Sequence, residues 1–386
     1  MRLNKREMIE LNDVCSYVSE RIGIDGLTLD NYISTENMIS NKEGICKSSG
    51  LPKINAVRYR KEDVLVSNIR PYFKKIWFAD REGGCSSDVL NFRANENYNS
   101  KFLYYVLSDD EFFRYSVGTS RGTKMPRGDK AALLKYSVPK ITIAEQERIV
   151  EILSIFDDKI ELNKKINNNL LEQAVALFNQ LISGQQKNGC LGDYCSVKSG
   201  FAFKSSWWQD TGVRVIKIGS INQDNLDLNS CSFVSEDKAS LAADFITKGG
   251  DLLIAMTGAT IGKFSMVPKT NEILLVNQRV GKFFLGSNPI DKLPFIYCQL
   301  KQDEIYNEVI NRGQGSAQPN ISAADIMSIP CVIPEKDMID SFNSTTSHLF
   351  ELIINNQSEK KQLEVLRNSL LPKLMSGELD VSEIVI

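Results

Sequence analysis

The sequence predicts an α+β protein in which two repeated α/β domains with twisted sheets are separated by two long helices that pair as an antiparallel coiled coil. Three observations predict this fold. An apolar seam with alternating steps of four and three residues occurs twice, 193 residues apart. Each seam follows short apolar runs separated by glycine-rich turns, as in a sheet. The chain of 386 residues also exceeds what one hydrophobic core usually organises.

The two seams have matching ends and matching lengths. The first runs through Ile149, Leu153, Phe156, Ile160, Asn163, Asn167, Leu170, Ala174, Leu177 and Leu181. The second runs through Phe342, Thr346, Leu349, Ile353, Asn356, Lys360, Leu363, Arg367, Leu370 and Leu374. Both are followed by a Ser-Gly pair, which is typical of a helix C-terminus. A helix of about 35 residues is roughly 50 Å long and needs a partner for its apolar stripe, so each can cover the other.

Asn163 and Asn356 occupy equivalent positions near the middle of the two seams. An antiparallel pairing would bring them close together, and a buried asparagine can fix the register of a coiled coil. The alternative is that both lie at an exposed edge of the seam, where a polar residue is tolerated. We favour the role in register.

The repeat extends through the segments that precede the helices. The motif at 11–16 matches 191–196, and the motif at 63–66 matches 251–254. We expect strands at 64–66, 76–78 and 89–92 in the first copy and at 213–218, 251–256, 273–276 and 280–285 in the second. Single helices are expected at 101–117 and 295–310, beside one small, curved antiparallel sheet in each copy. The predicted domains are 1–140, 141–188, 189–334 and 335–386.

Composition points to an ordinary globular protein of the cytoplasm. The apolar fraction is 42%, and no run of 18 apolar residues could span a membrane. The N-terminal residues lack the apolar core of a signal peptide. The eight cysteines form no CxxC pair, so we expect reduced, mostly buried thiols and neither a disulfide framework nor a metal site.

Catalytic motifs are weak in this chain. The one histidine, His348, lies in the second long helix with no nucleophile nearby, which argues against a histidine-dependent triad. The turn at 258–264 resembles a phosphate-binding loop, but it has one residue too few between its glycines, and Phe264 stands where Ser or Thr would hold Mg²⁺. Residues 68–73 resemble the Asn-Pro-Pro-aromatic loop of amino-methyltransferases only faintly. We therefore expect no catalytic residues.

A basic surface in the first copy is the strongest candidate for binding. Residues 1–140 contain 23 Lys and Arg against 18 Asp and Glu, whereas the whole chain has a net charge of −2. Basic residues interleaved with aromatic residues can neutralise phosphates and contact base edges. The candidates are Arg58, Arg60, Lys61, Arg70, Lys74 and Lys75, and a second basic loop that contains Arg121, Lys124 and Arg127. The alternative is a solvated basic face with no ligand.

The second copy has its own candidates. The counterpart of the basic loop is 312–320, where Lys and Arg give way to Gln, Ser and Asn. Two homologous loops with different polar side chains are expected if each copy reads a different DNA sequence. The candidate DNA-binding residues of this copy are Lys217, Thr257, Thr260, Lys263, Arg312, Gln318 and Asn320.

Several motifs resemble the specificity subunit of type I restriction-modification enzymes. The segment 139–150, PKITIAEQERIV, is similar to that family's entry into its spacer helix, and 371–379, LPKLMSGEL, is similar to the end of the second helix. The motifs at 200–203, 249–253, 257–262 and 277–278 resemble the family's second recognition domain. Two departures are the missing Glu-Gln pair at 334–337 and the missing Thr-Gly turn at 67–72.

The resemblance implies a non-catalytic adaptor. Each α/β domain would be a target-recognition domain that reads one half of a split site in double-stranded DNA. The helices would set the gap and dock two methyltransferase subunits, and restriction subunits would join through those. S-adenosylmethionine, ATP and Mg²⁺ would then bind to the partner subunits, with no cofactor in this chain. The alternatives are a coiled-coil scaffold that joins two protein-binding modules, and a self-contained enzyme.

Overall fold

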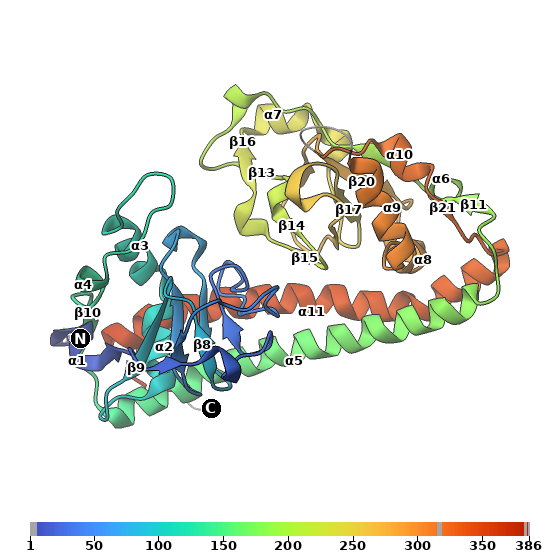
Figure 1. The fold of residues 1–386 in the computed structure, drawn as a ribbon. Helices are drawn as coiled ribbons and strands as arrows, with labels where there is room; N and C mark the ends of the chain where they lie inside the picture. The colour runs from blue at the N-terminus through green and yellow to red at the C-terminus, as the bar shows by residue number, and fades with distance from the viewer. Residues whose placement is uncertain (1–5, 315–318, 382–383, 385–386) are drawn as a thin grey trace. The chain divides into compact units, whose positions relative to one another are not determined.

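The computed structural model describes residues 6–314, 319–381 and 384. The chain forms two compact units. The first comprises residues 1–158 and 363–386, and the second comprises residues 159–362. Each unit therefore contains one globular part and a stretch of both long helices, which are green and red in Figure 1.

Two four-stranded sheets form the globular part of the first unit. The strand orders are β2-β9-β6-β7 and β3-β5-β8-β4. The first sheet is antiparallel throughout and consists of β2 (Cys15–Tyr17), β6 (Val64–Ser67), β7 (Ile76–Phe78) and β9 (Val89–Ala94). The second consists of β3 (Arg21–Ile22), β4 (Tyr32–Ile33), β5 (Ala56–Tyr59) and β8 (Gly83–Cys85). Its β4 and β8 are parallel. A short pair joins β1 (Met8–Glu10) to β10 (Ser137–Pro139).

The second unit repeats this plan. Its sheets have the orders β12-β20-β17-β18 and β16-β13-β19. The first contains β12 (Ser196–Ser199), β17 (Leu252–Ala255), β18 (Phe264–Met266) and β20 (Val280–Phe284). The second contains β13 (Val213–Ile216), β16 (Ser232–Val234) and β19 (Leu274–Val276). The remaining pairs join β11 (Gly189–Cys190) to β21 (Pro330–Cys331) and β14 (Ile221–Asn222) to β15 (Asn225–Leu226).

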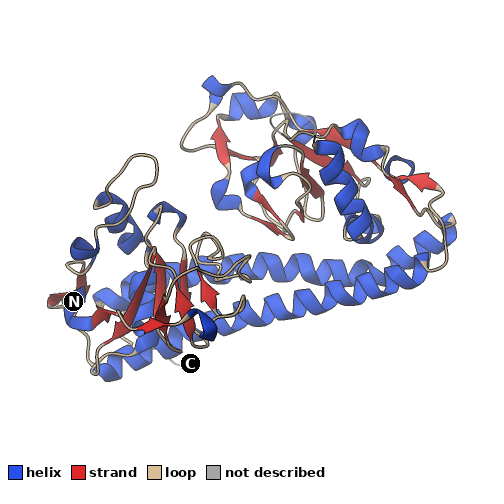
Figure 2. Cartoon of the chain, viewed as in Figure 1, coloured by secondary structure: helices blue, strands red, loops and turns tan. Residues whose placement is uncertain are grey.

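The strands predicted from the sequence are confirmed, but the prediction of a single antiparallel sheet in each copy is wrong. Each copy divides its strands between two larger sheets, and β13 pairs with β19 in parallel. Parallel pairing requires a long crossover connection, and the chain makes it between residues 217 and 273. Strand alternation alone contains no information about such a crossover. Figure 2 shows the short strands and the many loops of the globular parts.

The predicted helices 101–117 and 295–310 are each broken in two. The structure has α2 (Ser100–Ser108) and α3 (Asp110–Gly118), and then α8 (Leu293–Leu300) and α9 (Asp303–Gly313). At the first break, the Asp109 side chain accepts a hydrogen bond from the Glu111 amide at 2.9 Å and starts a new helix. Shorter helices are α1 (Leu11–Val14), α4 (Lys130–Leu133), α6 (Leu191–Tyr194), α7 (Glu236–Ser240) and α10 (Ala323–Met327).

The two long helices are α5 (Ile143–Ile182) and α11 (Lys336–Ser376). Thr142 and Glu145 form a reciprocal capping box at the start of α5, with the Thr142 amide 3.2 Å from the Glu145 carboxylate and the Glu145 amide 3.3 Å from the Thr142 hydroxyl. Both helices are followed by a glycine with positive φ, at +72° for Gly184 and +77° for Gly377. This left-handed conformation ends a helix and favours glycine, as the Ser-Gly pairs predicted.

Contacts inside each unit show that α5 and α11 run antiparallel. In the first unit, Arg367 donates to Asp157 at 2.6 Å. In the second unit, Asn356 donates to Asn167 at 2.8 Å, and the rings of Phe178 and Phe342 lie 5.8 Å apart. The residue number therefore rises on one helix as it falls on the other.

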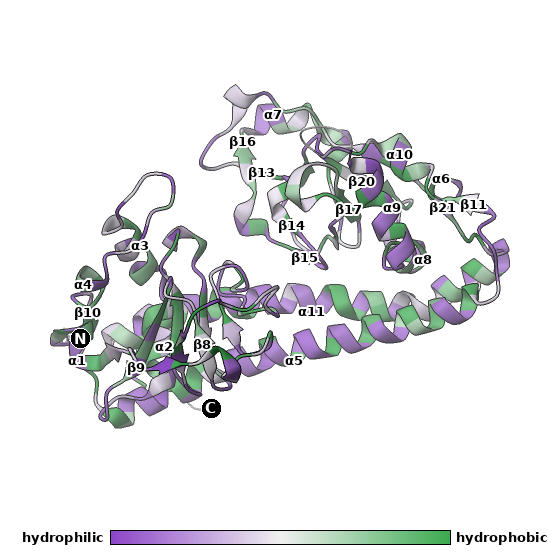
Figure 3. Ribbon diagram, in the orientation of Figure 1, coloured by the Kyte–Doolittle hydropathy of each residue, from purple (hydrophilic) through white to green (hydrophobic). Residues whose placement is uncertain are grey.

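The predicted seam is mostly buried, but it shifts by one residue near the end of α5. Leu177 is 39% exposed, whereas Phe178 is fully buried and packs against Phe295. A straight α-helix has 3.6 residues per turn, so a strict 3.5-residue pattern drifts around its surface along the helix. Figure 3 shows hydrophobic and hydrophilic turns alternating along both helices.

The two seam asparagines have different partners from the expected ones. Asn163 is 1% exposed and donates to Glu359 at 2.7 Å, whereas Asn356 donates to Asn167. Asn167 in turn donates to the Ile353 carbonyl at 3.4 Å. The polar middle of the seam is thus a chain of helix-to-helix hydrogen bonds, and a direct Asn163–Asn356 pair is not part of it. Their role in register stays a prediction.

Six of the eight cysteines are buried, while Cys46 is exposed and Cys190 is half-buried. Burial raises the pKa of the Cys15, Cys85, Cys195 and Cys331 thiols to about 12. These side chains therefore serve as small apolar groups in the cores at neutral pH.

Candidate nucleic-acid interface

The two basic segments of the first unit meet at one place, which we call the first junction (residues 68–70 with 126–128). The Arg70 amide donates to the Pro126 carbonyl at 2.8 Å, and the Gly128 amide donates to the Asn68 carbonyl at 3.2 Å. The first segment follows β6 directly, so the end of this buried strand holds the loop in place. The structure thus brings together two groups of candidates that lie about 50 residues apart in sequence.

The basic loop itself is a small hairpin. The backbones of Arg121 and Arg127 exchange hydrogen bonds at 2.9 and 3.0 Å, and Gly122 turns the chain with φ +96°. Lys124 and Met125 lie exposed at its tip. A short hairpin with an exposed cation can enter a groove of DNA.

The second unit builds the same arrangement, which we call the second junction (residues 256–258 with 319–321). The Gly258 amide donates to the Pro319 carbonyl at 2.9 Å, and the Ile321 amide donates to the Met256 carbonyl at 2.9 Å. Thr257 and Asn320 form an antiparallel bridge, as Ile69 and Arg127 do at the first junction. The candidate Gln318 lies outside the described residues.

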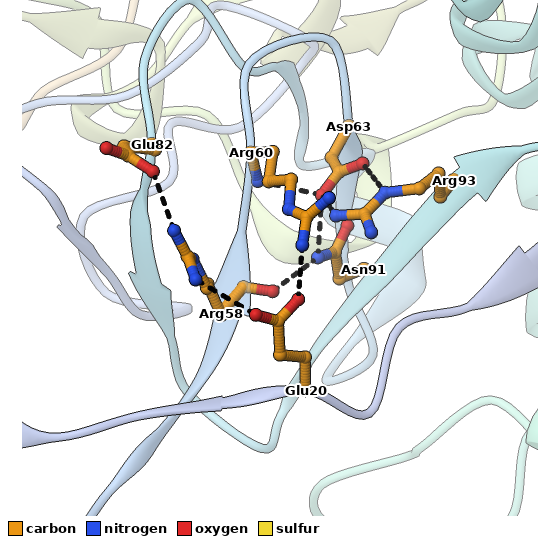
Figure 4. A network of polar contacts seen from close by, with 7 residues as sticks. All are labelled: Glu20, Arg58, Arg60, Asp63, Glu82, Asn91 and Arg93. Atoms are coloured by element: carbon orange, nitrogen blue, oxygen red, sulfur yellow. Dashed lines mark hydrogen bonds and ion pairs between the residues drawn. The ribbon is translucent and has the colours of Figure 1, made fainter.

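Many of the predicted DNA contacts are engaged in ion pairs. Arg58 lies 2.9 Å from Glu20 and 3.1 Å from Glu82, and Arg60 lies 3.0 Å from Glu20. Next to Arg60, the buried Asp63 accepts two hydrogen bonds from Arg93 at 2.7 Å. Figure 4 shows this network, which comprises Glu20, Arg58, Arg60, Asp63, Glu82, Asn91 and Arg93. These pairs neutralise Arg58 and Arg60 and tie β5 to its neighbours, which weakens the case for phosphate contacts there.

Lys74 and Lys75 also have protein partners. Lys74 lies 3.0 Å from Asp110, which Lys42 approaches at 2.7 Å. The Lys75 ammonium donates to the Thr35 carbonyl at 2.6 Å, and burial lowers its pKa. Both lysines anchor the loop after β6 to the rest of the unit.

Arg70 has an unusual backbone conformation. Its φ is +50°, and Lys74 has φ +49°, so two left-handed residues bracket the short 3-10 helix η2 (Pro71–Phe73). The second junction has a glycine with φ +73° at the equivalent place, Gly258. A bulky residue in this conformation is strained by roughly 1–2 kcal/mol. The turn leaves Tyr72 49% exposed and Phe73 38% exposed.

The hairpin arginines are paired but accessible. Arg121 is 85% exposed and lies 2.8 Å from Asp129, and Arg127 is 53% exposed and lies 3.3 Å from Asp88. For Lys124, the described part of the chain offers no hydrogen-bond or ion-pair partner. Exposed pairs of this kind contribute about 0–1 kcal/mol, so a phosphate can replace the acid.

The basic candidates of the second unit are more scattered. Arg312 lies 2.8 Å from Glu308 and donates to the Asp325 carbonyl at 2.9 Å, which joins α9 to α10. The Lys217 ammonium lies 3.7 Å from the centre of the Trp208 ring, and burial lowers its pKa. Lys263 is half-buried in the turn before β18.

A cavity of about 500 Å³ lies at the second junction. Its walls include Thr257 and Asn320 together with Gln278 and Arg279, two exposed residues from the turn between β19 and β20. The hydroxyl groups of Thr257 and Thr260 are buried and have no hydrogen-bond partner within the described ranges. Arg279 was not among the candidates predicted from the sequence, although it lies in the short turn between two predicted strands, directly before β20, where side chains are exposed.

No group of three or more His, Cys, Asp or Glu side chains among the described residues could hold a metal ion. No helix in the described ranges is long and apolar enough to cross a membrane.

Comparisons with known proteins agree on one family. The family model for the type I restriction modification DNA specificity domain matches residues 5–172 and 185–366. The specificity subunit of the type I restriction enzyme MjaVIII of Methanocaldococcus jannaschii is 24% identical, over 80% of this chain and 77% of the relative. The specificity subunit of the enzyme HindI of Haemophilus influenzae is 22% identical, over 96% of this chain and 98% of the relative.

A solved structure has a similar fold. The S subunit of a type I restriction-modification system from M. genitalium superimposes with a TM-score of 0.50 at 19% identity, over 97% of this chain and 98% of that one. This likeness concerns the fold alone.

Proposed function

The chain belongs to the family of type I restriction-modification specificity subunits, with two target-recognition domains, and from this premise we propose that each domain reads one half of a bipartite site in double-stranded DNA. The two halves would differ in sequence. The long helices would set the gap between them.

The duplicated junction is the observation that carries this proposal. Both units bridge the end of a central buried strand to a later loop with the same backbone hydrogen bonds. The backbone is repeated while the side chains change, from Ile69 and Arg127 to Thr257 and Asn320. A shared backbone arrangement with different side chains suits two domains that recognise different base sequences, because bases are distinguished by the hydrogen-bond donors and acceptors that face them.

Partner subunits would supply the catalytic activities. On α5, the apolar side chains of Leu162 and Ile166 are 49% and 38% exposed and lie one helical turn apart. Exposed apolar side chains on a helix suit a protein partner, and we assign this surface to a methyltransferase subunit. Two such subunits would bind and would recruit restriction subunits. S-adenosylmethionine, ATP and Mg²⁺ would bind to those partners in the cytoplasm, and this chain would be non-catalytic.

Co-expression with the methyltransferase subunit of the same type I system tests the proposal. The complex should bind duplex DNA with an affinity that falls steeply with salt, and it should methylate a bipartite site. A scaffold that joins two protein-binding modules would show no salt-dependent DNA binding. Methyl transfer by this chain alone would contradict a non-catalytic role.

A further inference from the structure

The β19–β20 turn places an exposed arginine at the second junction. Arg279 is exposed and lines the cavity there together with Gln278, Thr257 and Asn320. Within residues 6–314, 319–381 and 384, the Arg279 guanidinium has no ion pair, hydrogen bond or aromatic ring beside it. Arg121, Arg127 and Arg312 near the junctions each have an acidic partner, whereas Arg279 and Arg70 have none among the described residues.

The strand registers identify the counterpart of Arg279 in the first unit. Ser67 pairs with Val89 between β6 and β9, and Ala255 pairs with Val280 between β17 and β20. Val89 and Val280 are therefore equivalent, and so are the residues before them, Asp88 and Arg279.

The charges at these equivalent places are exchanged. In the first unit, Asp88 lies 3.3 Å from Arg127 of the basic loop, so the two charges neutralise each other. In the second unit, the loop residue is Asn320, which carries no charge, and the turn residue is Arg279. At this pair of positions the first junction has an ion pair, whereas the second has Asn320 and an Arg279 guanidinium with no partner among the described residues.

This group of side chains has the chemistry of base recognition. A guanidinium can donate two hydrogen bonds to the O6 and N7 atoms of guanine, and a Gln or Asn amide can pair in the same way with adenine. Thr257 is 7% exposed, and its hydroxyl, buried on the wall of the cavity, has no hydrogen-bond partner among the described residues. A water molecule or a ligand group can supply the missing partner of such a buried hydroxyl.

We propose that Arg279 reads a guanine in the half-site of the second domain, with Asn320 and Gln278 contacting the neighbouring bases. This assignment rests on the proposed function, since it presumes that the second domain reads DNA. The first domain must recognise its bases with other side chains, because its equivalent residue is Asp88, which is already paired with Arg127.

Methylation sequencing of the complex tests the assignment. We compare the native chain with Arg279→Ala, and with Lys269→Ala, which removes an exposed cation of the same unit as a matched control. With Arg279→Ala, one guanine of one half-site becomes degenerate, while the other half-site and the gap stay unchanged. The control methylates the native motif. Equal thermal unfolding of the three proteins shows that they are folded.

Binding measurements separate a base contact from a phosphate contact. A base contact predicts that Arg279→Ala weakens binding to the native site by about 10- to 100-fold, with little effect on unrelated DNA and no change in salt dependence. Uniform weakening on all sequences, with a shallower salt dependence, overturns the assignment, as does an unchanged motif. If the native complex methylates no bipartite site, the proposed function itself fails, and this outcome is visible before any variant is compared.

Discussion

Replacing Lys124 and Arg127 by alanine should weaken DNA binding through the first domain. Both lie on the exposed hairpin of the first junction, Lys124 without a partner in the described chain and Arg127 beside Asp88 at 3.3 Å. They therefore differ in how much of their charge is available to a phosphate. The matched control is Lys47→Ala with Lys53→Ala, which removes the same charge from an exposed loop of the same unit.

The magnitude follows from counterion release. Each phosphate contact contributes about 0.9 to the slope of log K against log salt, which corresponds to about a fivefold gain in affinity at physiological salt. Lys124→Ala should therefore weaken binding about fivefold. Arg127 must first leave Asp88, and an exposed ion pair costs about 0.2–1 kcal/mol to break, so its net contribution is between about one- and fourfold. The double variant should bind about 5- to 20-fold more weakly.

The assay is fluorescence anisotropy of the complex with the methyltransferase subunit on a labelled duplex, at several salt concentrations. The slope should become shallower by about 1.8 in the double variant and stay unchanged in the control. Asp88→Asn should strengthen DNA binding, because it removes the negative charge that pairs with Arg127 and keeps nearly the same side-chain shape. An unchanged slope in the double variant, or an equal change in the control, would refute the assignment of this hairpin to DNA.

Three further predictions concern other parts of the chain. Arg70→Gly should be more stable than Arg70→Ala by about 1 kcal/mol in thermal unfolding, because glycine adopts the φ of +50° without strain, and equal stability would contradict this. Asp251→Ala should lower the free energy of unfolding, measured in urea, by about 3–5 kcal/mol. The Lys282 ammonium lies 2.6 Å from the Asp251 carboxylate in the native chain, and the substitution leaves it buried without an acid. The double variant Asp251→Leu with Lys282→Met should recover most of the loss. Adding seven residues to each long helix lengthens it by about 10 Å, which is the length of about three base pairs. Methylation sequencing should then show a longer gap between the half-sites or no methylation. A changed half-site sequence would count against the helices as the spacer.

The sequence predicted the repeat, the long helices and the main strands, because each depends on local periodicity. The alternating seams and the Ser-Gly pairs were enough for α5 and α11. The drift from Leu177 to Phe178 was not predictable from a strict 3.5-residue pattern, since it depends on how the real helix packs against Phe295. The break at Asp109 was missed because helical spacing of apolar residues continues across a residue that caps a new helix.

The candidate site was predicted only in part, because charge composition does not reveal pairing. Arg58 and Arg60 looked like phosphate contacts in sequence, yet Glu20 and Glu82, which lie directly before β3 and β8, neutralise them. Arg279 was overlooked because its significance depends on its equivalence to Asp88, which requires the strand registers of both sheets. Long-range pairings of this kind cannot be derived from spacing along the chain.

Long-read methylation sequencing of a host that expresses this chain with its methyltransferase subunit tests the central claim most directly. Two target-recognition domains with the same frame and different side chains predict one motif made of two different half-sites, separated by a fixed gap of unspecified bases. A continuous motif, or two identical half-sites, would contradict the conclusion that each domain reads its own part of the DNA.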